Sequence, residues 1–179
     1  PLEQAITRWP GSCGEAAWDT LPHVRRVLAT ARANGIPVIH TTQSEAIPGW
    51  RDRPPLGRLD PEAAERRRHR YDIIEELAPA AGEAVLAKTA PSAFNQTWLL
   101  HHLRGLDVDT LIVAGESTSG CVRATVVDGK SYRYPILLPE ECVFDRHEAP
   151  HAINLFDMEQ KYAHVLPTAD VVAYLERIG

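Results

Sequence analysis

Short apolar segments alternate with segments of helical periodicity along this chain, and this alternation restricts the fold more than any other feature of the sequence. The expected strands, nearly all apolar, are residues 36–42, 85–87, 110–114, 135–138 and 165–166. The expected helices are residues 15–34, 95–104, 121–132 and 151–162, and a last one from about Thr168. Strands of this kind, separated by helices, form parallel sheets that are covered on both faces. We therefore predict an α/β fold with three αβα layers around a mostly parallel, Rossmann-like sheet.

The size and charge of the chain exclude several classes of protein. The 179 residues, of which 44% are hydrophobic, suit a single domain over residues 1–179 with a substantial core. A formal net charge of -5 gives no basic surface for nucleic acid, and no apolar run approaches the roughly 18 residues of a membrane span. Cys13, Cys121 and Cys142 form neither a disulfide framework nor a zinc-like spacing, and no signal peptide is recognisable. We expect a soluble, cytoplasmic protein that binds neither nucleic acid nor membrane.

The segment most suggestive of chemistry is residues 115–125, with the sequence Gly-Glu-Ser-Thr-Ser-Gly-Cys-Val-Arg-Ala-Thr. It follows one predicted strand and opens the helix predicted from Cys121. A cysteine at the start of a helix faces unpaired backbone N–H groups and the positive end of the helix dipole, which stabilise a thiolate. Cys121 is therefore a candidate nucleophile.

Three other interpretations of this turn are open. A phosphate-binding loop would use Gly115 and Gly120, but Cys121 and Val122 stand where that motif needs Lys and Ser or Thr. A serine nucleophile elbow would need a glycine where Ser119 stands. A buried structural cysteine is the third.

Lys88 directly follows the predicted strand 85–87. In parallel sheets, ligands bind beyond the carboxyl ends of the strands. Lys88 and Cys121 both fall at such ends, so we expect them at the same edge of the sheet. The long loop 43–61 would suit a cover for a site there, and the arginines at 66–68 and 70 suit a solvated or subunit-contacting surface.

Three motifs, in this order along the chain, resemble the isochorismatase-like cysteine hydrolases, and most closely their N-carbamoylsarcosine amidase and maleamate amidase branch. The motifs are Lys88-Thr-Ala-Pro-Ser-Ala-Phe94, then Ser117-Thr-Ser-Gly-Cys-Val-Arg-Ala-Thr125, then Asp145-Arg-His-Glu-Ala-Pro-His151 with Asn154-Leu-Phe-Asp157 and Lys161-Tyr162. The likeness extends over nearly the whole chain.

The resemblance implies a role for each residue of the turn. Cys121 would be the nucleophile and Lys88 the catalytic lysine of an Asp-Lys-Cys triad. A cis peptide bond that does not involve proline would join Glu116 to Ser117. Ser117 or Thr118, with the N–H of Cys121, would edge an oxyanion hole.

The resemblance also implies how substrate is held. Arg146 would bind a substrate carboxylate, although Arg146 could instead simply pair with Asp145. Apart from the resemblance, His147 and His151 flank Arg146 and are candidates to shape the pocket, with His147 as a substrate-binding residue. The metal ligands of nicotinamidase-type relatives are missing, because Thr41, Thr42 and Gln43 follow His40. We therefore expect no metal and no cofactor.

One part of the family pattern has no counterpart in this sequence. Members begin with an apolar strand that ends in Asp, and residues 1–14 do not resemble it. Asp19, on a predicted helix, and Asp60, in a Pro-rich loop, do not suit the role of the triad acid. We expect the sequence given to lack the first strand of the domain, with the acid supplied from upstream; the alternative is an inactive chain.

These observations predict a cysteine-dependent amidohydrolase. It would cleave a small carboxylate-bearing amide or carbamoyl compound, similar to N-carbamoylsarcosine or maleamate, to an acid and ammonia through a thioester. One alternative is a degenerate binding or assembly protein. Another is an isochorismatase-type vinyl ether hydrolase, although those relatives lack the nucleophilic cysteine. We also expect a homo-oligomer, either a dimer or a tetramer.

Overall fold

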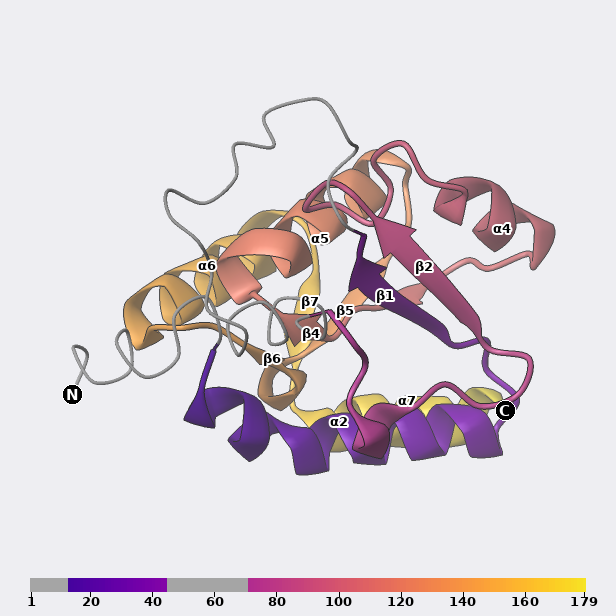
Figure 1. The fold of residues 1–179 in the computed structure, drawn as a ribbon, viewed down its shortest axis with the longest axis horizontal. Helices are drawn as coiled ribbons and strands as arrows, with labels where there is room; N and C mark the ends of the chain where they lie inside the picture. The colour runs from indigo at the N-terminus through magenta and orange to yellow at the C-terminus, as the bar shows by residue number, and fades with distance from the viewer. Residues whose placement is uncertain (1–12, 45–70) are drawn as a thin grey trace, which may run out of the picture.

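Short parallel strands lie between two layers of helices in the computed structural model, which describes residues 13–44 and 71–179 (Figure 1). The strands are β1 (Ile39–Gln43), β2 (Ala84–Lys88), β3 (Leu111–Ile112), β4 (Gly115–Glu116), β5 (Ile136–Pro139), β6 (Val143–Phe144) and β7 (His164–Leu166). The α-helices are α2 (Glu15–Ala33), α4 (Leu99–Gly105), α5 (Arg123–Ser131), α6 (Glu148–Lys161) and α7 (Thr168–Ile178). Shorter helical turns are η1 (Glu75–Leu77), η2 (Thr118–Val122) and η3 (Glu140–Cys142). Residues 1–12, Asp60, most of the 43–61 loop and the arginines at 66–70 lie outside the described residues.

Every strand pairing in the described ranges is parallel, as the alternation of strands and helices predicts. β1 pairs with β2, β3 and β7 flank β5, and β4 pairs with β6, which gives three separate ladders. Within the described residues, β1 and β3 are each paired along one edge only. The two-residue strands β4 and β6 are too short to have been predicted from an apolar pattern.

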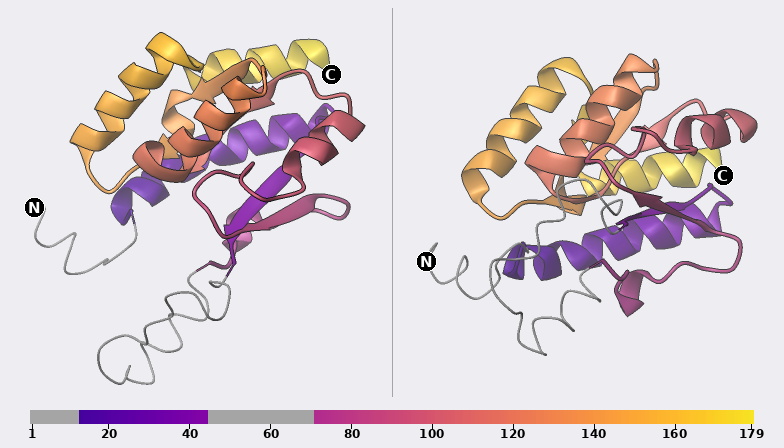
Figure 2. Two further views of the ribbon diagram at one scale, coloured as in Figure 1. Left: turned by 90° about the horizontal axis from the view of Figure 1, so that it is seen from above. Right: turned by 45° about the horizontal axis from the view of Figure 1, so that its top comes forward.

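The helices form one layer on each side of these strands, which confirms the three-layer prediction. Helices α2 and α7 lie side by side on one side, and α5 and α6 cover the other (Figures 1 and 2). The cluster under α2 and α7 consists of Val27, Ala31, Cys142, Val171, Val172 and Leu175. A second cluster includes Leu86, Val126, Ile136, Leu138 and Met158.

The first two strands differ from the prediction. β1 begins at Ile39 instead of residue 36, because Ile36 and Val38 pack against the cluster beneath α2 and α7 instead of pairing as a strand. β2 has one buried face rather than two: Leu86 is fully buried, whereas the side chain of Val85 is 45% exposed. The expectation that every strand is apolar and covered on both faces is therefore wrong for this pair.

Two helices begin at residues other than those predicted. α4 begins at Leu99, four residues beyond the predicted start, because Gln96 adopts a left-handed conformation with φ 54°. α6 begins at Glu148, three residues before the predicted start, with Pro150 in its first turn, where a missing N–H breaks no helical bond. α2 ends as predicted before Gly35, whose φ is 66°. No helix within residues 13–44 or 71–179 is both long and apolar enough to span a membrane.

Candidate active site

Lys88 is the last residue of β2 and lies beside Cys121. Of the three cysteines, Cys121 alone is not buried. The Lys88 ammonium donates hydrogen bonds to Sγ of Cys121 at 3.2 Å and to the carbonyl oxygen of Ala90 at 3.2 Å. Lys88 is 6% exposed. The two residues therefore meet at one sheet edge, as their positions after predicted strands indicated. The contact places a hydrogen-bond donor that carries a positive charge directly beside the sulfur.

Cys121 is presented by a tight turn and not by the first residue of the following helix. It lies in η2, and α5 begins two residues later at Arg123, so the predicted helix start at residue 121 is corrected. The carbonyl oxygen of Ser117 accepts bonds from the N–H groups of Gly120 at 2.9 Å and Val122 at 3.2 Å. Gly120 interrupts the turn with φ -112° and ψ -106°. A Cβ at this position would lie 2.5 Å from Oγ of Ser117, so the turn requires glycine here.

The strand β4 leads into this turn. The peptide bond between Glu116 and Ser117 is cis, at the position that the resemblance implies. Glu116 pairs with Phe144 of β6, and its carboxylate lies beside the buried thiol of Cys13. The turn thus starts from a fixed point on the β4–β6 ladder.

The hydroxyl of Thr118 forms its hydrogen bond with α6 and not with the nucleophile. Its side chain is fully buried, and its hydroxyl shares a hydrogen bond of 2.8 Å with Nδ1 of His151 in the first turn of α6. Of the two hydroxyls predicted to edge an oxyanion hole, that of Thr118 is occupied, which leaves Ser117 as the candidate.

Asp145, the residue after β6, is bonded to the same turn. Its Oδ2 accepts the backbone N–H of Ser119 at 2.7 Å and its Oδ1 accepts the N–H of Arg146 at 2.8 Å. Burial alone would raise the pKa of Asp145, but the bonds from Ser119 and Arg146 and the positive charge of Arg146 outweigh it and lower the pKa. From the sequence, Asp145 is expected only as a partner of Arg146. Its position directly after a strand was the signal that could have found its second role.

Arg146 and His147 follow on the same segment. Arg146 is exposed, and His147 is extended and immediately precedes α6. Nδ1 of His147 is buried and has no hydrogen-bond partner among the described residues. Both stay predicted substrate-binding residues, and Asp145 connects their segment to the nucleophile turn.

Comparison with known proteins identifies the family. The isochorismatase domain matches residues 4–170. The chain belongs to the isochorismatase family. Over 155 residues it is 38% identical to a maleamate amidohydrolase of Pseudomonas putida, covering 86% of this chain and 73% of that protein. Over 166 residues it is 34% identical to an N-carbamoylsarcosine amidase of Arthrobacter, covering 88% of this chain and 62% of that protein. The chain thus spans less than two thirds of the latter.

The fold is that of solved isochorismatase-like hydrolases. The crystal structure of N-carbamoylsarcosine amidase from Thermoplasma acidophilum superposes with a TM-score of 0.68 and 29% sequence identity, covering 86% of this chain and 84% of that chain. The isochorismatase-like fold expected from the motifs is therefore confirmed.

Several motif residues of this isochorismatase-family protein hold helices together. Arg123, at the start of α5, donates to Asn154 at 3.2 Å and pairs with Asp157 at 2.6 Å, and its guanidinium lies 5.9 Å from the centre of the Tyr162 ring. Asp157 also bonds to the Lys161 ammonium. The third motif thus anchors α6 to the helix that follows the nucleophile.

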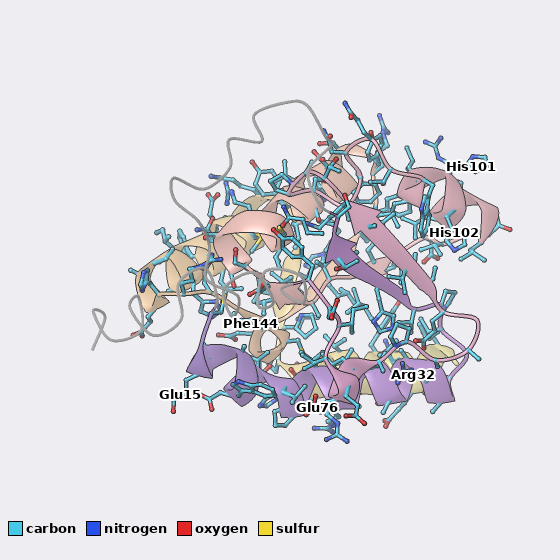
Figure 3. All side chains as sticks on the ribbon, in the orientation of Figure 1. Glu15, Arg32, Glu76, His101, His102 and Phe144 are labelled. Atoms are coloured by element: carbon cyan, nitrogen blue, oxygen red, sulfur yellow. The ribbon has the colours of Figure 1, made fainter. Side chains whose placement is uncertain are left out.

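Two other histidines lie at a distance from the segment that follows β6. His101 and His102 lie on α4, well away from Phe144, the residue that precedes Asp145 (Figure 3). Asp19 is exposed on α2. No group of three or more His, Cys, Asp or Glu side chains within residues 13–44 and 71–179 is arranged to hold a metal ion.

Proposed function

We propose that this isochorismatase-family protein is a cysteine-dependent amidohydrolase that cleaves a small amide or carbamoyl compound bearing a carboxylate. The observation that carries the proposal is the 3.2 Å contact between the buried Lys88 ammonium and Sγ of Cys121. Relatives named maleamate amidohydrolase and N-carbamoylsarcosine amidase, at 38% and 34% identity, support the substrate class.

The chemistry follows from the thiolate. Cys121 attacks the carbonyl carbon, and the backbone N–H of Cys121 and the edge formed by Ser117 receive the developing negative charge on oxygen. Removing a single donor of this kind typically costs about 3 to 4 kcal/mol of transition-state stabilisation. The carbon–nitrogen bond breaks, and the nitrogen leaves as ammonia after it takes the proton that the thiol gave up. Water then hydrolyses the thioester, which yields the carboxylic acid and regenerates the thiol.

The proton needs a carrier, and Asp145 is a poor candidate for this role. Both of its oxygens already accept backbone N–H bonds, and its lowered pKa makes it a weak base. We propose that the triad acid is a residue other than Asp145. Lys88 would keep that acid ionised and oriented.

Arg146 is proposed to bind the substrate carboxylate, with His147 beside it. The planar guanidinium favours bidentate recognition of a carboxylate. Holding the far end of the substrate fixes the distance and angle at the reacting carbonyl. Nδ1 of His147, which is buried and has no hydrogen-bond partner within residues 13–44 and 71–179, is available for a further polar contact with substrate.

The test is a panel of small amides and carbamoyl compounds, with and without a carboxylate, assayed for released ammonia. The protein is assayed alongside a Cys121→Ser variant. We expect ammonia from acid-bearing amides and none from the variant. Pyruvate released from isochorismate would instead favour the vinyl ether hydrolase, and a protein that folds but turns over no substrate would favour the non-catalytic alternative.

A further inference from the structure

The proposed mechanism gives Asp145 no chemical role, although this residue is bonded to the nucleophile turn. It is 7% exposed, and its carboxylate accepts the backbone N–H of Ser119, 26 residues earlier in the chain, and that of Arg146, the next residue. One of these belongs to the nucleophile turn, two residues before Cys121. The other belongs to the residue proposed to bind the substrate carboxylate.

The strands β4 and β6, which precede the two bonded segments, hold these segments close together. β4 and β6 are parallel and pair Glu116 with Phe144, the last residue of each strand. Beyond this pair the chains diverge, one into η2 and the other toward α6. Asp145 is the first residue after the ladder, so its carboxylate joins the two segments where they separate.

We propose that Asp145 is a positioning residue that sets the distance between the arginine proposed to bind the substrate carboxylate and the nucleophile, so that a substrate of fixed length reaches both. This rests on the proposed function of Arg146. A carboxylate can accept both N–H groups, whereas an asparagine amide offers one acceptor oxygen and an NH2 group that cannot accept. Asp145→Asn should therefore lose either the bond that joins this segment to Ser119 or the local bond that orients the backbone of Arg146, and either loss shifts the arginine relative to the nucleophile turn.

A second bond provides a matched control. Thr118 and His151 also connect the nucleophile turn to α6, by a hydrogen bond of 2.8 Å, but they do not contact the backbone of Arg146. Thr118→Val keeps the size of the side chain and removes this bond. It should slow the reaction of Cys121 with charged and neutral reagents alike.

The experiment compares the alkylation rates of Cys121 by iodoacetate, which carries a carboxylate, and by the neutral iodoacetamide. Mass spectrometry after short exposures gives the ratio of the two rates for the wild type, Asp145→Asn, Asp145→Glu, Thr118→Val and Arg146→Met. We expect the ratio to fall by about fivefold in Asp145→Asn, the size of a modest charge-assisted contact, and to keep its value in Thr118→Val. Asp145→Glu retains the charge and lengthens the bridge by one methylene, so a fall there reports geometry alone.

The direction in which the ratio of the iodoacetate rate to the iodoacetamide rate changes distinguishes the possible roles of Asp145. If Asp145 acted only through its charge, Asp145→Asn would remove repulsion and raise the iodoacetate ratio. If it only supported the fold, both rates would change together and the ratio would stay constant. Either result, with no fall in Asp145→Glu, would overturn the proposal.

The same series distinguishes this inference from the proposed function. A ratio unaffected by Arg146→Met would contradict carboxylate binding by Arg146 and the coupling that depends on it. A fall in Arg146→Met with none in the Asp145 variants would contradict the coupling alone. Because alkylation requires no turnover, failure of the wild type to release ammonia from any amide would count against the amidohydrolase and leave this measurement intact.

Discussion

At the scale of single residues, the three cysteines occupy surroundings that separate their reactivities. Burial and the neighbouring Glu116 carboxylate raise the pKa of Cys13 to about 12, and burial raises the pKa of Cys142 to about 11. At pH 8 a thiol with a pKa of about 12 is ionised in roughly one molecule in ten thousand. Cys121 is only partly buried and accepts a hydrogen bond from the Lys88 ammonium.

Cys121 should therefore be the cysteine that iodoacetamide modifies first in the native protein. The reagent is added below one equivalent, and peptide mass spectrometry locates the label. Cys121→Ser should lose most of the labelling under the same conditions. Label found mainly on Cys13 or Cys142 would contradict the assignment of the nucleophile.

Lys88→Met should abolish ammonia release while the fold stays nearly intact. The expected role of Lys88 is electrostatic, and methionine retains most of its length and apolar volume at the strand end. Lys130→Met, on the exposed side of α5, is the matched control and should keep full activity. Ammonia release and circular dichroism are measured on both variants. Turnover near the wild-type rate in Lys88→Met would exclude the triad.

At the scale of elements, a carboxylate ties the end of α2 to the strands that carry Lys88. Glu83 accepts bonds from Arg32 Nε at 2.7 Å, His40 Nε2 at 2.8 Å and the N–H of Ala80 at 2.8 Å. The Arg32 guanidinium, with the N–H of Ala80 and His40, lowers the pKa of Glu83 well below its ordinary value despite the opposing effect of burial. The network fixes β1 and β2 against α2.

Glu83→Gln should reduce the free energy of unfolding at pH 7 by about 2 kcal/mol, the order of a charged hydrogen bond. The folded-state pKa of Glu83 is depressed, so its stabilisation is present above the unfolded-state pKa of about 4.3 and is lost as the pH falls through the folded-state value. The difference between wild type and variant should therefore shrink below about pH 4. Urea titrations across this range measure it. Glu76→Gln, exposed on η1 (Figure 3), is the control and should change the free energy of unfolding at pH 7 by less than about 0.5 kcal/mol.

Sequence patterns predicted the elements better than their ends. The apolar periodicity of residues 15–34 identified α2 almost to the residue, because that helix has a complete amphipathic face and a glycine after it. β4 and β6 were not predicted, because a strand of two residues is too short to show a periodic apolar pattern. The site was predictable where a motif residue follows a strand, as with Lys88. The bonds of Asp145 to Ser119 and of His151 to Thr118 depend on how β6 and α6 approach η2, which no local pattern encodes.

At the scale of the whole molecule, the two helical layers enclose separate apolar clusters. Leu175 of α7 is fully buried in the cluster with Val27 and Ala31 of α2. Neither Lys88 nor Cys121 belongs to this cluster, so we expect a cavity at Leu175 to leave their contact in place.

Leu175→Ala should therefore lower the free energy of unfolding by about 3 kcal/mol through the cavity that it leaves. The rate of Cys121 alkylation at temperatures well below unfolding should not change. Ile178→Ala, on the same helix at a position 48% exposed, should cost well under about 1 kcal/mol. Urea denaturation compares the midpoints at constant slope. Equal losses in both variants would contradict the packing of α7 described above.

The hydrogen bonds of the candidate site connect distant parts of the sequence. Lys88 and Cys121 are 33 residues apart, as are Thr118 and His151, and Ser119 and Asp145 are 26 apart. Contacts of this range form only after the intervening loops have closed. During synthesis, Cys121 is added to the chain before Asp145 and His151, so the contacts of Ser119 with Asp145 and of Thr118 with His151 form only once translation has passed the first turn of α6. The surroundings of the nucleophile are therefore completed by a segment that is made after it.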